Sequence, residues 1–184
     1  LLSQEAFLPD SVLSPRRLLE TGLMGRERIN ERRLEQWQFI AQLPEGYFTR
    51  SDTSLFDWRA TAELRFYAGE GLYTTQFYLG DTLPDRAYVL DLGQVEGVAE
   101  VRLNTQAIDT LLAPPYRLDL SPYVQRGNNT LEIWLAVPPR NEWVGRARQG
   151  EPGFGPYRAL PLIPVGLLGP VRLLEIALPT TGPD

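Results

Sequence analysis

The side chains best suited to binding chemistry stand close together late in the chain, at Arg140, Asn141, Trp143, Arg146 and Tyr157. A tryptophan or tyrosine ring offers an apolar face on which the C–H groups of a sugar can stack. Arginine presents planar hydrogen-bond donors, and asparagine presents both a donor and an acceptor. We therefore interpret these five residues as a candidate carbohydrate-binding site.

A structural role for the same residues is the alternative. A buried tryptophan is a common anchor for a long loop, so Trp143 would then lie beneath the proline-rich stretch 138–164. The arginines would pair with Glu142 and Glu151 instead of meeting a ligand. Both interpretations are open at the level of the sequence.

The segment 140–148 is expected to be a loop, because Pro139 and Gly145 disfavour regular structure. It follows a predicted strand directly, which places it at one end of the fold, where loops commonly carry function. Further aromatic and basic side chains fall in or near predicted loops: Trp58, Tyr116, Arg117 and Arg158. We expect Trp58 and Tyr116 to anchor the core and Arg117 to lie at the surface.

The composition excludes several kinds of catalytic chemistry. The 184 residues contain no Cys and no His, so they cannot build a thiol nucleophile, a Ser-His-Asp triad or a His/Cys zinc site. A net charge of -5 argues against nucleic acid as a partner. Glycoside hydrolysis needs two carboxyl groups facing each other across a cleft, but Glu100 and Asp119 alternate with apolar residues as outward charges. We expect no enzyme activity from this chain on its own.

No cofactor is expected either. Residues 150–155 (GEPGFG) are rich in glycine, but no helix follows them, as a phosphate-binding loop requires. A structural calcium ion stays an alternative, held at the turn with Asp81 and Asp85 or at the loop beside Asp52.

A two-residue alternation of apolar and polar side chains organises residues 88–120. This period is typical of half-buried antiparallel strands. The same alternation returns at residues 131–137. The predicted buried face contains Ala99, Val101, Leu103, Leu118, Leu120, Leu131, Ile133 and Leu135.

The order of several motifs resembles the sugar-binding jelly roll of glycoside hydrolase family 2. These motifs are LDLG (90–93), VAEVRLN (98–104), PPYRLDL (114–120) and a Gly-Asn pair before a strand (127–133). The closing GLLGPVRLLEI (166–176) is similar to the end of the accessory jelly roll of bacterial family 106 α-L-rhamnosidases. Residues 55–79 resemble the opening of that family. The resemblance covers roughly residues 34–178.

The resemblance implies an all-β, antiparallel jelly-roll sandwich of the galactose-binding-domain type. It also implies a non-catalytic carbohydrate-binding or accessory domain of a larger bacterial enzyme, in which a separate barrel performs hydrolysis. The expected partners are carbohydrate and that catalytic domain, and the expected location is periplasmic or secreted. The alternative is a purely structural module that packs between domains and binds no sugar.

One departure from the family pattern concerns the turn after the VAEVRLN strand, where Asn104-Thr105 replaces the usual Asn-Gly. A tight turn with positive φ at its second position suits threonine poorly, so residues 104–112 are expected to form a loop of different shape.

The expected domain organisation has three parts: a partly helical N-terminal extension (1–33), the jelly roll (34–178) and a tail (179–184). Ser14-Pro15 and Gly22 resemble the start and stop of a helix, and residues 26–36 are rich in helix-forming residues. The chain begins at Leu1 and shows neither a signal peptide nor a long apolar segment. We interpret it as a fragment of a longer protein.

Overall fold

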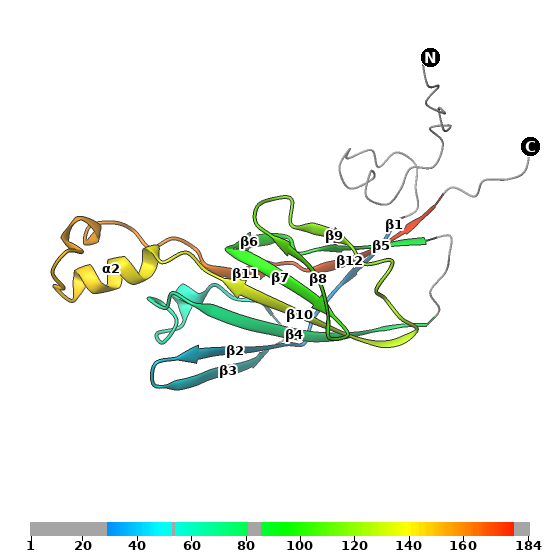
Figure 1. Ribbon diagram of the computed structural model, residues 1–184, viewed down its shortest axis with the longest axis horizontal. Helices are drawn as coiled ribbons and strands as arrows, with labels where there is room; N and C mark the ends of the chain where they lie inside the picture. Colours follow the sequence, from blue (N-terminus) through cyan, green and yellow to red (C-terminus); the bar gives the residue numbers. More distant parts are fainter. Residues whose placement is uncertain (1–28, 53, 81–85, 179–184) are drawn as a thin grey trace, which may run out of the picture.

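The computed structural model describes residues 29–52, 54–80 and 86–178 (Figure 1). The predicted helix at 14–22, the predicted tail and the candidate calcium residues Asp81 and Asp85 lie outside this part of the chain, as does the side chain of Asp52. No helix in the described ranges has the length and apolar character needed to cross a membrane.

Two antiparallel sheets form the main part of the fold, and a two-stranded sheet adjoins them (Figure 1). The larger sheet has the order β3 (Gly46–Asp52), β2 (Trp37–Leu43), β4 (Glu70–Leu79), β10 (Gly127–Ala136), β7 (Val98–Leu103) and β8 (Gln106–Leu111). The four-stranded sheet has the order β1 (Ile29–Arg33), β12 (Arg172–Ala177), β5 (Arg86–Asp91) and β9 (Arg117–Asp119). The small sheet pairs β11 (Gly166–Gly169) with β6 (Gln94–Glu96). The helical elements are η1 (Trp58–Ala60), α2 (Arg140–Arg148) and η2 (Gly155–Tyr157).

The predicted buried face is confirmed. All eight residues expected in the core are buried, and apolar residues of both large sheets belong to one core cluster. On β10, buried Leu131, Ile133 and Leu135 alternate with more exposed neighbours. The fold is thus the antiparallel β-sandwich that the alternation and the jelly-roll resemblance predicted, with little helix.

A hydrogen-bonded aromatic pair lies at the centre of the core. The indole Nε1 of Trp58 donates to the hydroxyl of Tyr73 at 2.6 Å, and the backbone N–H of Leu167 donates to the same oxygen at 3.2 Å. Burial raises the pKa of Tyr73 to about 12. The pair connects η1, β4 and β11 and so links the large sheet to the small sheet.

The prediction of a helix over 26–36 is wrong for the part that the structure describes. Residues 29–33 form β1, which pairs with β12 from Ile29 opposite Ile176 to Arg33 opposite Arg172. Glu31 forms an ion pair with Arg172 at 2.6 Å. Pairing with a sheet edge has outweighed the helix propensity of this charged segment, which is a weak preference.

The expectation of an altered loop at 104–112 is also wrong. Asn104 and Thr105 form a two-residue turn with φ of 51° and 69°, and β8 follows at once. Both positive values are those of the type I′ hairpin turn. The side chain of Asn104 fixes this turn, because its Oδ1 accepts from Thr130 N at 2.9 Å and its Nδ2 donates to Asn129 Oδ1 at 3.0 Å.

Replacing Thr105 with glycine is expected to stabilise the fold. Relief of the left-handed conformation contributes about 1–2 kcal/mol, and the greater freedom of glycine in the unfolded chain opposes it by about 0.5–1 kcal/mol. We predict a net gain near 1 kcal/mol for Thr105→Gly in urea denaturation followed by tryptophan fluorescence. Thr105→Ala is the control, since it keeps the Cβ atom. Equal stability of the two variants would contradict the strained turn.

Candidate functional site

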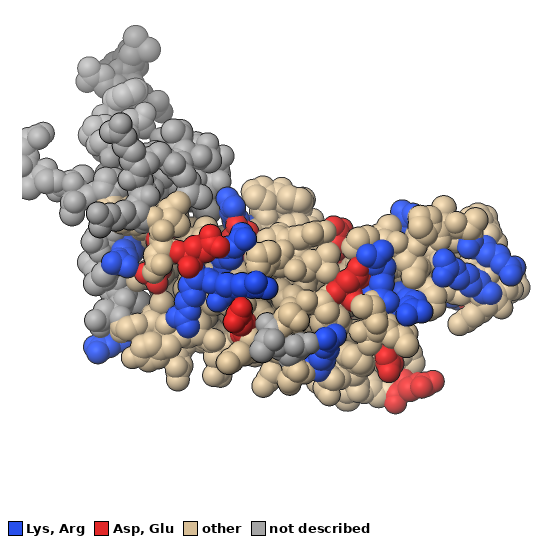
Figure 2. All heavy atoms as spheres, turned by 180° about the vertical axis from the view of Figure 1, so that it is seen from behind, with Lys and Arg blue, Asp and Glu red and all other residues tan. Residues whose placement is uncertain are grey.

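The residues of the candidate site lie on a projection from one end of the sandwich. We call residues 138–165 the arm: the chain leaves β10, forms α2 and η2, and returns to β11 (Figure 1). Basic side chains are visible over the arm, at the right in Figure 2. The arm carries Arg140, Arg146, Arg148 and Arg158.

The expectation of a loop at 140–148 is wrong, because these residues form the nine-residue helix α2. Pro139 precedes the first helical residue, and proline is tolerated at a helix start. Gly145 is required by packing: a Cβ atom there would lie 2.8 Å from Cγ of Phe66. The two residues that suggested a loop are therefore compatible with a helix: Pro139 lies at its start, and Gly145 is needed for packing.

Asn141 is fully buried and holds the two sides of the arm together. Its Nδ2 donates to the carbonyl of Ile163 at 2.9 Å, and its Oδ1 accepts from the N–H of Ile163 at 3.0 Å. Both polar ends of the amide are therefore occupied by one backbone residue. The structure places Asn141 in the framework beneath the candidate site.

Arg146 is held in place by two carboxylates. Its Nε donates to Glu151 Oε2 at 2.7 Å, its Nη2 donates to the other oxygen of Glu151, and Glu142 lies 3.6 Å from its Nη1. The hydrogen bond from Arg146 lowers the pKa of Glu151. Exposed ion pairs of this kind add little stability, but they orient a side chain. The pairing of Arg146 with Glu142 and Glu151 is the one that the structural alternative predicted.

Three aromatic rings gather on the arm, and we call Trp143, Phe154 and Tyr157 the arm cluster. The ring centroids of Trp143 and Tyr157 are 5.2 Å apart, and those of Phe154 and Tyr157 are 6.4 Å apart. The guanidinium of Arg146 lies 4.2 Å from the centroid of Phe154. All three rings are half-buried, so part of each faces solvent. The fold thus brings Trp143, Arg146 and Tyr157 together, with Phe154 as a member that the sequence interpretation missed.

Arg140 contacts the segment that returns from η2. Its Nη2 donates to the carbonyl of Pro161 at 3.5 Å, and its Nε is buried with no hydrogen-bond partner in the described ranges. Like Asn141, it faces the returning segment of the arm.

The other candidates have structural roles. Trp58 and Tyr116 are buried, as predicted, and the hydroxyl of Tyr116 donates to the carbonyl of Gly97 at 3.0 Å. Arg117 lies at the surface and binds the buried carboxylate of Asp91 through Nη2 at 2.7 Å. Arg158 is exposed on the arm.

The carboxylates near the arm act as anionic partners. Burial opposes ionisation of Asp57, but hydrogen bonds from Arg59 and Val165 lower its pKa overall. A glycosidic general acid needs the opposite, a raised pKa that keeps the proton. Among the residues that the structure describes, no three His, Cys, Asp or Glu side chains group together in a way that could hold a metal ion.

Comparisons with known proteins point to glycoside hydrolases. No family model matches the chain. It is 34% identical over 85 residues to a Formosa agariphila protein named "Putative beta-glucuronidase", a match that covers 45% of this chain and 7% of that protein.

Solved structures give longer matches. The rhamnosidase from Novosphingobium sp. PP1Y matches 80% of this chain with 30% identity and a TM-score of 0.67, over 15% of its own length. A beta-glucuronidase from an uncultured Clostridium sp. matches 84% of this chain with 16% identity and a TM-score of 0.57, over 30% of its own length, and so supports the fold alone. The structural neighbours are glycoside hydrolases of which this chain corresponds to a small part.

Loss of the Asn141 amide is expected to loosen the arm without unfolding the sandwich. Asn141→Ala leaves the N–H and C=O of Ile163 without their partners, at a cost of about 2 kcal/mol. Hydrogen exchange read by mass spectrometry should show faster exchange over 158–165 and unchanged exchange over β7 and β10. Gln149→Ala, at an exposed position beside the same helix, is the control. Unchanged protection of 158–165 in Asn141→Ala would show that this amide does not hold the arm.

Proposed function

We propose that this chain is a non-catalytic accessory β-sandwich domain of a larger bacterial glycoside hydrolase, and that it binds carbohydrate. The match to the Novosphingobium rhamnosidase carries the proposal, because it takes in 80% of this chain but 15% of that protein. A segment of that size corresponds to one accessory domain, and the rest of the enzyme lies outside it. The beta-glucuronidase relative agrees, since the chain covers 7% of it.

The chemistry of the chain supports a binding role in place of hydrolysis. The absence of His and Cys removes thiol nucleophiles, Ser-His-Asp triads and His/Cys zinc sites. Asp57 and Glu151 are paired with Arg59 and Arg146 and have lowered pKa values, so neither carboxyl group is held protonated as a general acid requires. We place hydrolysis in another domain of the parent protein, and we propose a periplasmic or secreted location for the whole.

The arm cluster is the proposed carbohydrate site. Trp143 and Tyr157 offer partly exposed ring faces, and Arg146 brings guanidinium donors beside them. Asn141 and Arg140 belong to the same proposal as supports, since they fix the returning segment on which the cluster depends. A sugar ring would stack on the aromatic faces while its hydroxyl groups accept from the arginine.

An interdomain role for the arm is the second candidate. The amide of Asn141 and the Nε and Nη2 donors of Arg146 are occupied within the arm, and the arm projects from the sandwich (Figure 1). A projection with aromatic and basic side chains can equally pack on a neighbouring catalytic domain. In that role the arm cluster would bury itself against protein.

The variant Trp143→Ala separates the two roles. For the carbohydrate site on the arm we predict loss of binding to at least one glycan that the unaltered chain retains, with a fall in unfolding free energy of no more than about 1 kcal/mol. Isothermal titration calorimetry gives the first quantity and thermal denaturation the second. Tyr47→Ala is the matched control, because Tyr47 is an aromatic residue of β3 that is 69% exposed. A large fall in melting temperature with unchanged binding per folded molecule would assign Trp143 to packing.

A further inference from the structure

The outer face of the six-stranded sheet carries a tryptophan at its centre. Trp134 lies on β10 between the buried Ile133 and Leu135, so its side chain points away from the core. It pairs across the sheet with Leu72 of β4 and Glu100 of β7. The side chain is half-buried, which leaves part of the indole open to a ligand.

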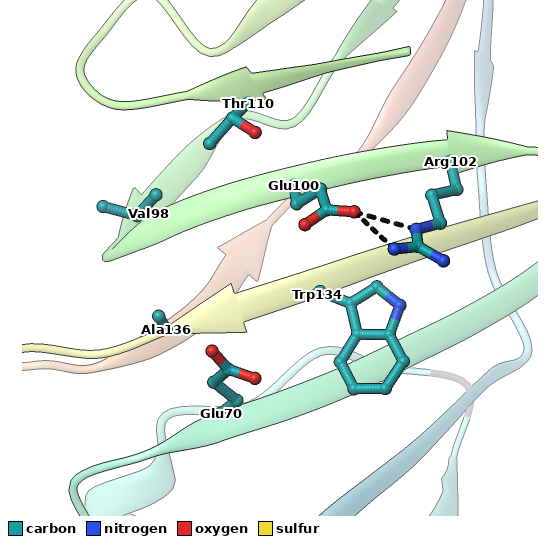
Figure 3. Close-up of a pocket in the computed structure, with 7 residues that line it drawn as sticks. All are labelled: Glu70, Val98, Glu100, Arg102, Thr110, Trp134 and Ala136. Atoms are coloured by element: carbon teal, nitrogen blue, oxygen red, sulfur yellow. Dashed lines mark hydrogen bonds and ion pairs between the residues drawn. The ribbon is translucent and has the colours of Figure 1, made fainter. Parts of the chain in front are cut away.

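A hollow of about 320 Å³ opens over this residue (Figure 3). It is lined by Glu70, Val98, Glu100, Arg102, Thr110, Trp134 and Ala136. Figure 3 shows the indole ring between Glu70 on one side and the Glu100–Arg102 pair on the other. The volume is at the lower end of the range for small-ligand pockets.

The polar groups of the hollow can still bind a ligand. Arg102 donates to Glu100 Oε1 through Nε and Nη2, each at 2.8 Å, but both side chains are about 40% exposed. An exposed pair of this kind contributes little stability, so it can share its hydrogen bonds with an incoming hydroxyl group. The indole N–H of Trp134 is buried and has no hydrogen-bond partner in the part of the chain that the structure describes. Its nitrogen lies on the side of Arg102 in Figure 3, where a ligand oxygen can reach it when that exposed side chain moves.

The hollow continues into a row of side chains that crosses the strands. Ile40, Leu72 and Trp134 are cross-strand neighbours, and the row goes on to Glu100 and Thr110. Five strands at a spacing of ~4.8 Å give this row a length of about 19 Å. One half of it is apolar and the other half polar, which suits an extended ligand with both kinds of surface.

We propose that this face is a saccharide-binding site separate from the arm, and that it takes an uncharged oligosaccharide lying across the strands with one ring stacked on Trp134. The C–H groups of the sugar stack on the aromatic face. Its hydroxyl groups donate hydrogen bonds to the carboxylates of Glu70 and Glu100 and accept them from Arg102.

The charge of the face selects against acidic sugars. Glu70, Glu100 and Glu132 carry three negative charges on this side of the sheet, and Arg102 carries one positive charge. Glu132 is paired in register with Arg102, so it lies beside the hollow. A uronic acid would meet net repulsion here, whereas a neutral sugar would not.

The test uses the full 184-residue chain labelled with ¹⁵N, in which each of the four tryptophans gives an indole N–H signal. The Trp134 signal is assigned by its loss in Trp134→Phe. The probes are xylohexaose, mannohexaose and cellohexaose as neutral chains and trigalacturonic acid as the acidic one. We expect at least one neutral probe to shift the Trp134 signal saturably, and the acidic probe to bind about tenfold more weakly or not at all.

Variants locate the site. Trp134→Ala should weaken binding of the neutral probe about tenfold or more, and Glu70→Gln, at an exposed position that the fold does not need, should weaken it severalfold. Trp143→Ala should leave the shift of the Trp134 signal unchanged. If Trp134→Ala does not fold, Glu70→Gln and the assigned signal decide the outcome.

Two results would overturn this site. One is a Trp134 signal that none of the neutral probes moves. The other is binding that is abolished by Trp143→Ala and unaffected by Trp134→Ala or Glu70→Gln, which would leave the arm proposal standing. Binding that depends on Trp134 alone would support this site and contradict the carbohydrate site proposed on the arm.

Discussion

The hydrogen bond between Trp58 and Tyr73 is the contact on which most of the architecture depends. Both side chains are fully buried, so each polar group needs a partner inside the protein. The hydroxyl of Tyr73 satisfies the indole of Trp58 and also accepts from Leu167, and the backbone N–H of Trp58 donates to Val165 at 3.0 Å. The segment that returns from the arm is thereby fixed to the centre of the core. Gly166 must be glycine at this point, because its φ is +123° and a Cβ atom would lie 2.9 Å from the Trp58 ring.

Both proposed binding surfaces follow from this fixed core. β10 buries Ile133 and Leu135 on one face and turns Trp134 outward on the other, so one strand serves the core and the sheet surface together. Beyond Ala136 the same strand runs into the arm, whose far end is held by Val165 and Leu167. An arm tied at both ends and clamped by Asn141 can present the arm cluster without ordering a long loop at each binding event.

Strict alternation made the core predictable from the sequence. Ala99, Val101 and Leu103 could be assigned to the buried face because a strand side chain changes face at every residue. Such a pattern is absent where the structure was not foreseen. β1 is exposed along its whole length and β8 is mostly exposed, so neither shows an apolar period. Only tertiary pairing reveals them as strands.

The sequence predicted most residues of the candidate site but not the secondary structure that carries them. Trp143, Arg146 and Tyr157 do come together, but a helix and not a loop carries the first two. This helix was not predicted, because the packing of Gly145 on Phe66 cannot be read from local residue preferences. Asn141 was expected at a ligand and is found clamping Ile163, a contact between residues far apart in the chain. Trp134 was overlooked since its surroundings exist only after β4 and β7 bring Glu70 and Glu100 beside it.

We propose that this domain binds carbohydrate and does not cleave it. The most direct measurement applies the labelled chain to an array of plant and microbial glycans and assays the retained glycans for newly released reducing ends. We predict reproducible retention on at least one class of glycan, with no reducing ends above the level of a protein-free control. Absence of retention on every glycan, or release of sugar by the purified chain, would contradict it.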